Sequence, residues 1–264
     1  MSNASETELP DMLLTRARQR GRHFEFVDSP EQVGGEVAIP GYWFEAHHAP
    51  GRAGVRIAAD RLREYLPRTA NAIAEFCTDV RVARFSRNKV DDDTHIGLFY
   101  ISYYVRKETH ERWPLALVGS LPNPAPTAVP KFWDSAPSKL REFTAVVHDG
   151  LVEDDFFDNG IDSVADWMTM EEYASLTGVL DDIGPVTVSD SSYQAVDISY
   201  APKPPEMGVI GHNGRRVAYM FDTRDPGGLA WSFGDDMLMQ QDAPIGDVLD
   251  SVISTRLAAS SEHP

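Results

Sequence analysis

The sequence predicts an α+β fold with mainly antiparallel sheets flanked by helices. Runs of β-branched and aromatic residues alternate with Gly and Pro breaks, as in short strands joined by turns. Asn213-Gly214 lies between two apolar runs, which predicts a hairpin with a type I′ turn. Residues 244–257 carry apolar side chains at helical spacing, which predicts an amphipathic helix near the C-terminus. With 264 residues and 42% hydrophobic content, the chain is long and apolar enough to bury a core.

Residues 1–121 are expected to form a β-rich unit with one or two helices. Strands are predicted at residues 24–27, 36–47, 54–58, 80–85, 95–106 and 113–118, and short helices at residues 11–22 and 59–66. A linker should follow at residues 122–136, since residues 121–130 contain four prolines, which favour an extended and stiff chain.

Residues 137–264 are expected to form a second α+β domain. Pro137 can occupy the first position of a helix, and Gly150 can supply the positive φ that ends it. Thr169 and Glu172 have the spacing of a capping box at the start of another short helix, predicted at residues 169–176. Strands are predicted at residues 186–188, 194–200, 208–221 and 229–233, and the final helix at residues 244–257.

The net charge of −17 belongs entirely to the second half. Residues 1–148 contain 19 acidic and 19 basic side chains, whereas residues 149–264 contain 22 acidic and 5 basic ones. An acidic surface repels nucleic acids and anionic membranes and attracts basic proteins. The sequence therefore favours a basic protein partner over nucleic acid or membrane, although a surface that serves only solubility would give the same charge.

Cysteine usage and the termini point to a cytoplasmic protein. The single cysteine, Cys77, excludes an intramolecular disulfide and a cysteine-based zinc site, and we interpret it as a packed thiol. The first ten residues are polar, and no apolar run is long enough for a membrane span. No cofactor or resident metal is expected.

Few residue groups in the sequence have the spacing of a catalytic site. Asp91, Asp92 and Asp93 with His95 could bind a divalent metal, and Asp222 with Asp225 could do the same, but turn chemistry explains both groups. The sequence lacks a G-x-S-x-G elbow, an H-E-x-x-H motif, a P-loop and a dinucleotide fingerprint. We therefore expect no enzymatic activity, with a metal-dependent hydrolase as the less favoured alternative.

The second half resembles the SUKH superfamily. The matching pieces are Pro137, Leu140, Phe143, the turn at residues 148–151, the strand around residues 217–222, the Trp231-Ser-Phe233 segment and the helix at residues 245–257. The resemblance covers about residues 130–259 and leaves the first half without a family. It implies a sheet covered by a C-terminal helix, and a function in binding.

Bacterial members of this superfamily include immunity proteins that neutralise polymorphic toxins, often nucleases. By this resemblance the chain would be such a protein, or a regulatory or scaffold protein of the same fold with an endogenous partner. The predicted partner-binding site is an acidic loop with two aromatic anchors, formed by Glu153, Asp154, Asp155, Phe156, Phe157 and Asp158. The alternative is an acidic turn whose two phenylalanines pack into the core.

Overall fold

The computed structural model describes residues 8–19, 23–33, 38–86, 94–105, 112–153, 159–177, 187–189, 202–214, 217–234 and 237–261. These residues form an α+β fold with antiparallel sheets and flanking helices, as predicted. The chain divides into two compact units. The first contains the described residues up to Pro122, Glu153, and the end of the last helix from Ile253 onward, and the second contains the other described residues from Asn123 to Val252.

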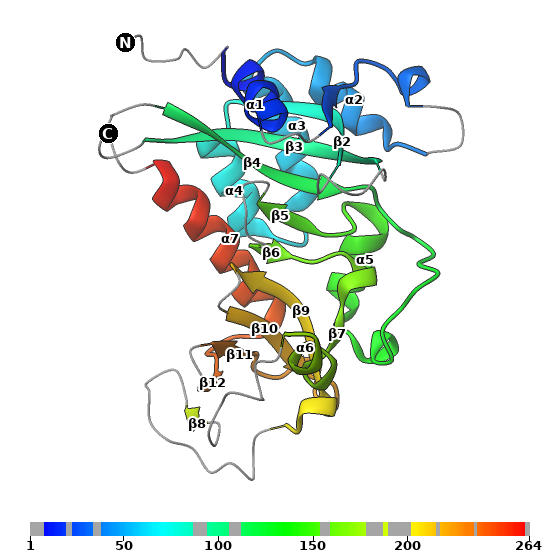
Figure 1. Cartoon of the computed structure of the whole chain (residues 1–264), viewed down its shortest axis with the longest axis vertical. Coiled ribbons are helices and arrows are strands. Elements are labelled where there is room, and N and C mark those ends of the chain that lie inside the picture. The colour runs from blue at the N-terminus through cyan, green and yellow to red at the C-terminus, as the bar shows by residue number, and fades with distance from the viewer. Residues whose placement is uncertain are drawn as a thin grey trace. The chain divides into compact units, whose positions relative to one another are not determined.

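The first unit contains helices on an antiparallel sheet (Figure 1). Its helices are α1 (Leu9–Gln19), α2 (Gly41–His48), α3 (Arg52–Leu62) and α4 (Pro67–Phe76). Its strands are β1 (Phe24–Phe26), β2 (Asp79–Ser86), β3 (Thr94–Val105) and β4 (Arg112–Ser120), which pair in that order. Phe24 pairs with Phe85, and Tyr100 pairs with Leu117.

Both faces of this sheet are buried. Alternate side chains of a strand point to opposite faces, so Phe85 and Phe99 lie on one face and Val82 and Tyr100 on the other. The first face packs against α1 through Leu9 and neighbouring apolar residues. Helices α2 and α3 contact β2. A sheet between helical layers therefore forms the core of the first unit.

Two strand predictions in the first unit were wrong. Residues 41–48 and 52–62 form helices α2 and α3, although strands were expected at residues 36–47 and 54–58. The apolar side chains here follow helical spacing: Val55, Ala58, Ala59 and Leu62 are all buried on one face of α3. The breaks at Pro40 and Gly51 are helix N-caps rather than strand ends. Strands β1, β2, β3 and β4 were predicted correctly within a few residues.

The second unit contains short strands and helices (Figure 1). Its elements are α5 (Ser138–Val146), β5 (Leu151–Glu153, whose last residue groups with the first unit), β6 (Gly160–Ile161), β7 (Met168–Thr169), α6 (Met170–Thr177), β8 (Thr187–Ser189), β9 (Met207–Asn213), β10 (Val217–Asp222), β11 (Trp231–Gly234), β12 (Met237–Gln240) and the beginning of α7 (Ile245–Ser261). The strand order is β5-β6-β9-β10-β11-β12-β8, with β7 beside β9. The β12–β8 pair is parallel and the other pairs in this order are antiparallel.

Local sequence signals placed the main elements of the second unit correctly. Strands β9 and β10 form the predicted hairpin, but the expected type I′ turn is wrong: Asn213 is the last residue of β9 and pairs with Val217, so it is not a central residue of a two-residue turn. Gly214, which follows it, has a φ of 63°. Helix α7 begins at Ile245, as expected from its apolar spacing. Met170 of α6 belongs to the same buried apolar cluster as Met220 and Trp231 of the sheet. The strand predicted at residues 194–200 lies outside the described residues.

Gly150 has the expected positive φ, but it does not end α5, which ends at Val146 with Val147 as its C-cap. The φ of Gly150 is 94°, and a Cβ there would lie 2.9 Å from the backbone nitrogen of Ser163. The neighbouring Asp149 accepts hydrogen bonds from the backbone N–H of Val164 (2.8 Å) and from the side chain of Asn123 (3.2 Å). The turn after α5 is thus fixed to the segment that follows β6.

Candidate binding site on the second unit

The first residue of the predicted acidic loop, Glu153, belongs to a strand instead. Glu153 is the last residue of β5 and only 8% exposed. Its carboxylate accepts hydrogen bonds from Nε (3.0 Å) and Nη2 (3.3 Å) of Arg256. Its charge is therefore compensated inside the first unit. The other predicted residues, Asp154, Asp155, Phe156, Phe157 and Asp158, lie outside the described residues, and their role stays a prediction.

The acidic surplus appears on the described surface of the second unit as exposed carboxylates. Arg224 forms ion pairs with Asp222 (2.8 Å) and Glu206 (3.1 Å), so these two carboxylates compensate its charge within the unit. Its hydrogen bonds lower the pKa of Asp222. By contrast, Glu171, Asp225 and Asp247 are among the exposed carboxylates of this unit that make no ion pair within the described part of the chain. We refer to these three residues as the uncompensated carboxylates.

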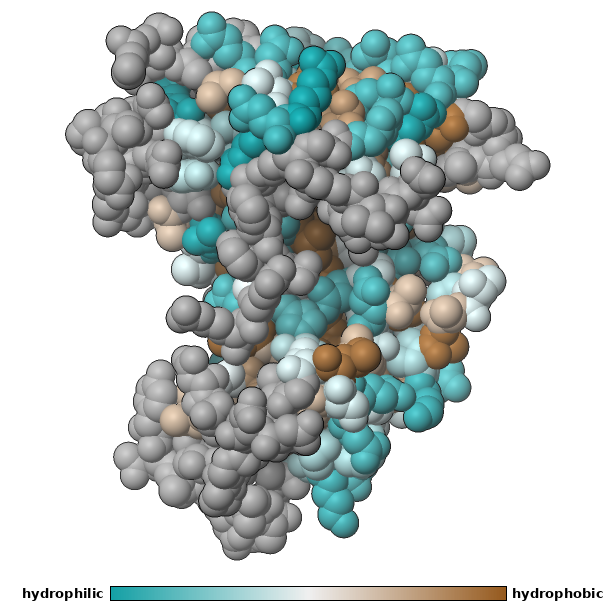
Figure 2. Space-filling model, viewed as in Figure 1, coloured by the Kyte–Doolittle hydropathy of each residue, from teal (hydrophilic) through white to brown (hydrophobic). Residues whose placement is uncertain are grey.

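A shallow groove with a volume of about 780 Å³ lies beside Glu171. We call it the Leu176 groove; it is lined by residues 128–131, by Ala165, Trp167 and Met168, and by Glu171, Glu172, Ser175 and Leu176 of α6. Leu176 is 74% exposed and Val129 is 48% exposed. Figure 2 shows hydrophobic residues at the surface of this unit among hydrophilic ones. The groove thus combines apolar surface with carboxylates.

The register of α6 explains why the groove is apolar. The helix buries Met170 and Ala174 against the sheet. Residues three and four apart share a helix face, so Glu171, Ser175 and Glu172, Leu176 fall on the side that lines the groove. Leu176 is therefore not required by the core on which α6 packs.

Hydrogen bonds fix the start of α6 as the capping box predicted. The Thr169 hydroxyl accepts from the backbone N–H of Glu172 (3.2 Å), and the Glu172 carboxylate accepts from the backbone N–H of Thr169 (2.9 Å). The same carboxylate accepts from Nζ of Lys131 (3.1 Å). These hydrogen bonds, with that of the Thr169 backbone foremost, lower the pKa of Glu172. The contact between Lys131 and Glu172 thus joins the two walls of the groove, which are the segment at residues 128–131 and helix α6.

Trp167 lines the groove and packs against a second tryptophan, Trp133. The Trp167 indole N–H donates to the backbone oxygen of Asp162 (2.9 Å), and its ring lies 5.7 Å from that of Trp133. The Arg141 guanidinium lies over the Trp133 ring at 5.9 Å. Because Trp167 is both buried and hydrogen-bonded, we expect the groove to be preformed rather than created by a ligand.

A histidine–aspartate pair lies on the other side of α6. Nδ1 of His212 on β9 is 2.6 Å from Oδ2 of Asp162, and the His212 ring lies 5.3 Å from that of Tyr173. Asp162 is buried, and its backbone N–H donates to Ile210. The pair connects the segment after β6 to β9 and helps to position α6.

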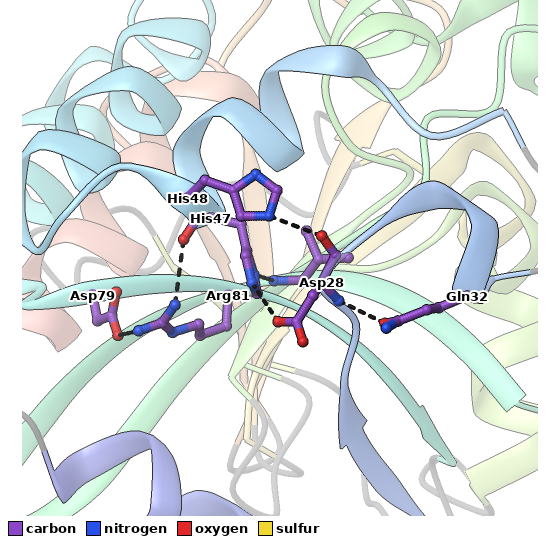
Figure 3. A network of polar contacts seen from close by, with 7 residues as sticks. Asp28, Gln32, His47, His48, Asp79 and Arg81 are labelled. Atoms are coloured by element: carbon purple, nitrogen blue, oxygen red, sulfur yellow. Dashed lines mark hydrogen bonds and ion pairs between the residues drawn. The ribbon is translucent and has the colours of Figure 1, made fainter.

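A second histidine network lies in the first unit (Figure 3). Nε2 of His47 is 3.2 Å from Oδ1 of Asp28, and Nδ1 accepts from the backbone N–H of Val82 (3.0 Å). Arg81 donates to the backbone oxygen of His47 and pairs with Asp79. Burial lowers the pKa of His47. Both ring nitrogens are engaged, so this network ties α2 to β2 and to the segment after β1.

Of the two groups considered for metal binding, only Asp222 with Asp225 lies wholly within the described structure. Asp91, Asp92 and Asp93 lie outside it, and His95 is exposed on β3. Both carboxylate oxygens of Asp222 accept hydrogen bonds from the Arg224 side chain. Among the described residues, no cluster of three or more His, Cys, Asp or Glu side chains could hold a metal ion. Cys77 is fully buried, which raises its pKa to about 12 and confirms the packed thiol.

Sequence reasoning missed the Leu176 groove and both histidine networks. The capping box located the start of α6, but the segment at residues 128–131 was assigned only to a linker. His47-His48 carries no nearby partner in the sequence, because Asp28 lies 19 residues away. In each case the signal depends on contacts that no local pattern contains.

Comparison of the chain with protein-family models, with curated proteins and with solved structures finds no match. In the part of the chain that the structure describes, no helix combines the length and the apolar character needed to cross a membrane.

Proposed function

We propose that this chain is a non-enzymatic binding protein that holds a basic protein partner. The observation that carries the proposal is that exposed carboxylates of the second unit make no ion pair among the described residues. Arg224 and Lys131 are paired with carboxylates of the same unit, whereas Glu171, Asp225 and Asp247 remain uncompensated. Uncompensated carboxylates on a folded surface attract a basic partner and accelerate its association.

The resemblance to the SUKH superfamily makes the proposal more specific. We propose an immunity protein that neutralises a basic, nuclease-like toxin, because nucleases carry basic grooves for their phosphate substrates. An acidic face that fills such a groove would block substrate binding without any chemistry of its own. The loop at Asp154 to Asp158 remains proposed as a further part of this face.

The test is capture of a partner on the immobilised chain at low and at high salt. We expect a basic partner that is retained at low salt and released at high salt, since screening weakens interactions between exposed charges. If the captured protein has nuclease activity, adding the purified chain should inhibit that activity. Capture of only neutral or acidic proteins, or a nuclease that stays fully active in the complex, would contradict the proposal.

A charge-reversal variant tests the contribution of the uncompensated carboxylates. The triple variant Glu171→Lys, Asp225→Lys, Asp247→Lys should associate with the basic partner at least about tenfold more slowly at low salt. The triple variant Asp11→Lys, Glu45→Lys, Glu64→Lys makes the same change of charge on exposed carboxylates of the first unit and serves as the control. Circular dichroism should establish that both variants fold as the unmodified chain does.

A further inference from the structure

We infer that the Leu176 groove receives an amphipathic basic segment of the partner protein. In this arrangement an apolar side chain of the segment lies against Leu176 and Val129, and a lysine or arginine faces Glu171. The inference rests on the proposed function, because it specifies where on the second unit a basic partner is recognised.

The apolar content of the groove is the first argument. Leu176 is the most exposed large hydrophobic side chain among the described residues, and Val129 lies in the same groove. Apolar surface in a concave site gains free energy when a partner side chain covers it. Since α6 already buries Met170 and Ala174 against the sheet, the fold of the second unit does not need Leu176 at this position.

The charge beside the groove identifies the kind of occupant. Glu171 is exposed and uncompensated, and it lines the same groove as Leu176. A neutral apolar ligand would leave this carboxylate without a partner, whereas a basic amphipathic segment satisfies both features. A second copy of this chain is opposed by the charge of −17 that each copy carries.

The groove is also prepared for binding before the partner arrives. The capping box of Thr169 fixes the start of the helix that carries Leu176, and the buried Trp167 in the lining of the groove donates a hydrogen bond to the backbone oxygen of Asp162. A preformed site costs less conformational entropy on binding than a site that must order itself. Its shallow shape suits a chain segment better than an enclosed small molecule.

Two synthetic peptides test the inference. One is an amphipathic helix of leucine and lysine, and the other has the same length and charge with alanine in place of each leucine. The proposed function predicts that both bind in a salt-dependent manner. The groove predicts that the leucine peptide binds about tenfold more tightly, the difference expected when one leucine side chain becomes buried.

Matched variants locate the binding site of the leucine peptide. Leu176→Ser should remove most of its advantage over the alanine peptide, whereas Leu229→Ser, a change at another leucine that is 43% exposed, should preserve it. Glu171→Gln should weaken the binding of both peptides more than Glu142→Gln does. Glu142 is an exposed residue of α5 that does not line the groove. Isothermal titration calorimetry measures the affinity of each peptide for the unmodified chain and for each variant.

Different failures have different meanings. If neither peptide binds the unmodified chain, the proposed function fails together with this inference. If both peptides bind equally, or if Leu176→Ser and Leu229→Ser have the same effect, only the groove is excluded. If the unmodified chain is dimeric in sedimentation and Leu176→Ser makes it monomeric, a second copy occupies the groove and the inference is overturned.

Discussion

Lys131 and Glu172 form an ion pair that joins the two walls of the Leu176 groove, with Nζ 3.1 Å from Oε1. The lysine is 84% exposed and lies in the segment before α5, whereas the glutamate belongs to the capping box of α6. The pair compensates the charge of Glu172, one of the two carboxylates that line the groove, and leaves the charge of Glu171 free to attract a ligand. It therefore limits the negative charge that a basic partner meets.

Removing this lysine should strengthen the binding of basic ligands. Lys131→Ala releases Glu172, so we expect the leucine–lysine peptide to bind about two- to fivefold more tightly at low salt. The free energy of unfolding should change by less than about 0.5 kcal/mol, because exposed ion pairs contribute little. Lys139→Ala, which removes an exposed lysine of α5 outside the groove, is the control. An equal gain in both variants would assign the effect to net charge alone.

The capping box makes Thr169 important for stability. Thr169→Ala removes the hydroxyl that accepts from the backbone N–H of Glu172, and we expect a loss of about 1 kcal/mol in the free energy of unfolding. Thr169→Ser keeps the acceptor and should recover most of this loss. Urea denaturation measures both. Thr177→Ala, at the exposed end of the same helix, should change stability less; an equal loss there would contradict a specific role of the cap.

The elements that the sequence predicted correctly are those with local signals. The capping box at Thr169, the Asn213-Gly214 hairpin and the apolar spacing of α7 each depend on residues a few positions apart. The error at residues 41–62 has a physical reason. Aromatic and β-branched residues resemble a strand in composition, but here they cover one side of each helix, and Pro40 and Gly51 precede helices.

The candidate site was less predictable because it depends on distant contacts. Glu153 was expected in an exposed acidic loop, yet Arg256, 103 residues further along the chain, binds its carboxylate. Leu176 was assigned correctly to a helix, but the helix alone does not tell that residues 128–131 lie beside it. Charge counts located the acidic half of the chain, and only the fold distinguishes compensated carboxylates from uncompensated ones.

The burial of Cys77 predicts an inert thiol in the native state. Its pKa of about 12 leaves almost no thiolate at about pH 8, and its sulfur is inaccessible to reagents. A thiol-specific chromogenic reagent should therefore react slowly with the folded chain and rapidly with one thiol per chain after denaturation in urea. Fast stoichiometric reaction without denaturant would show that α4 opens readily around the cysteine.

His47 predicts a loss of stability as the pH falls. Its Nδ1 accepts from the backbone N–H of Val82, so protonation at that nitrogen would break the hydrogen bond. Burial is the main cause that lowers its pKa in the folded chain, with Asp28 acting against it and Arg81 and His48 adding to it. In the unfolded chain the pKa should be about 6.5. Below this pH the unfolded state binds more protons, and the free energy of unfolding decreases.

The measurement compares urea denaturation at about pH 7.5 and about pH 5.5, the range in which histidine normally titrates. His47→Gln offers a neutral acceptor that does not titrate, so it should lose less stability than the unmodified chain over this interval. His48→Gln is the matched control, since the exposed His48 ring contacts only the backbone oxygen of Asp28 among the bonds of this network. It should keep most of the pH dependence of the unmodified chain, because burial, and not the charge of His48, is the main cause that lowers the pKa of His47. If both variants show the same pH dependence, the titration that destabilises the fold belongs to a residue other than His47.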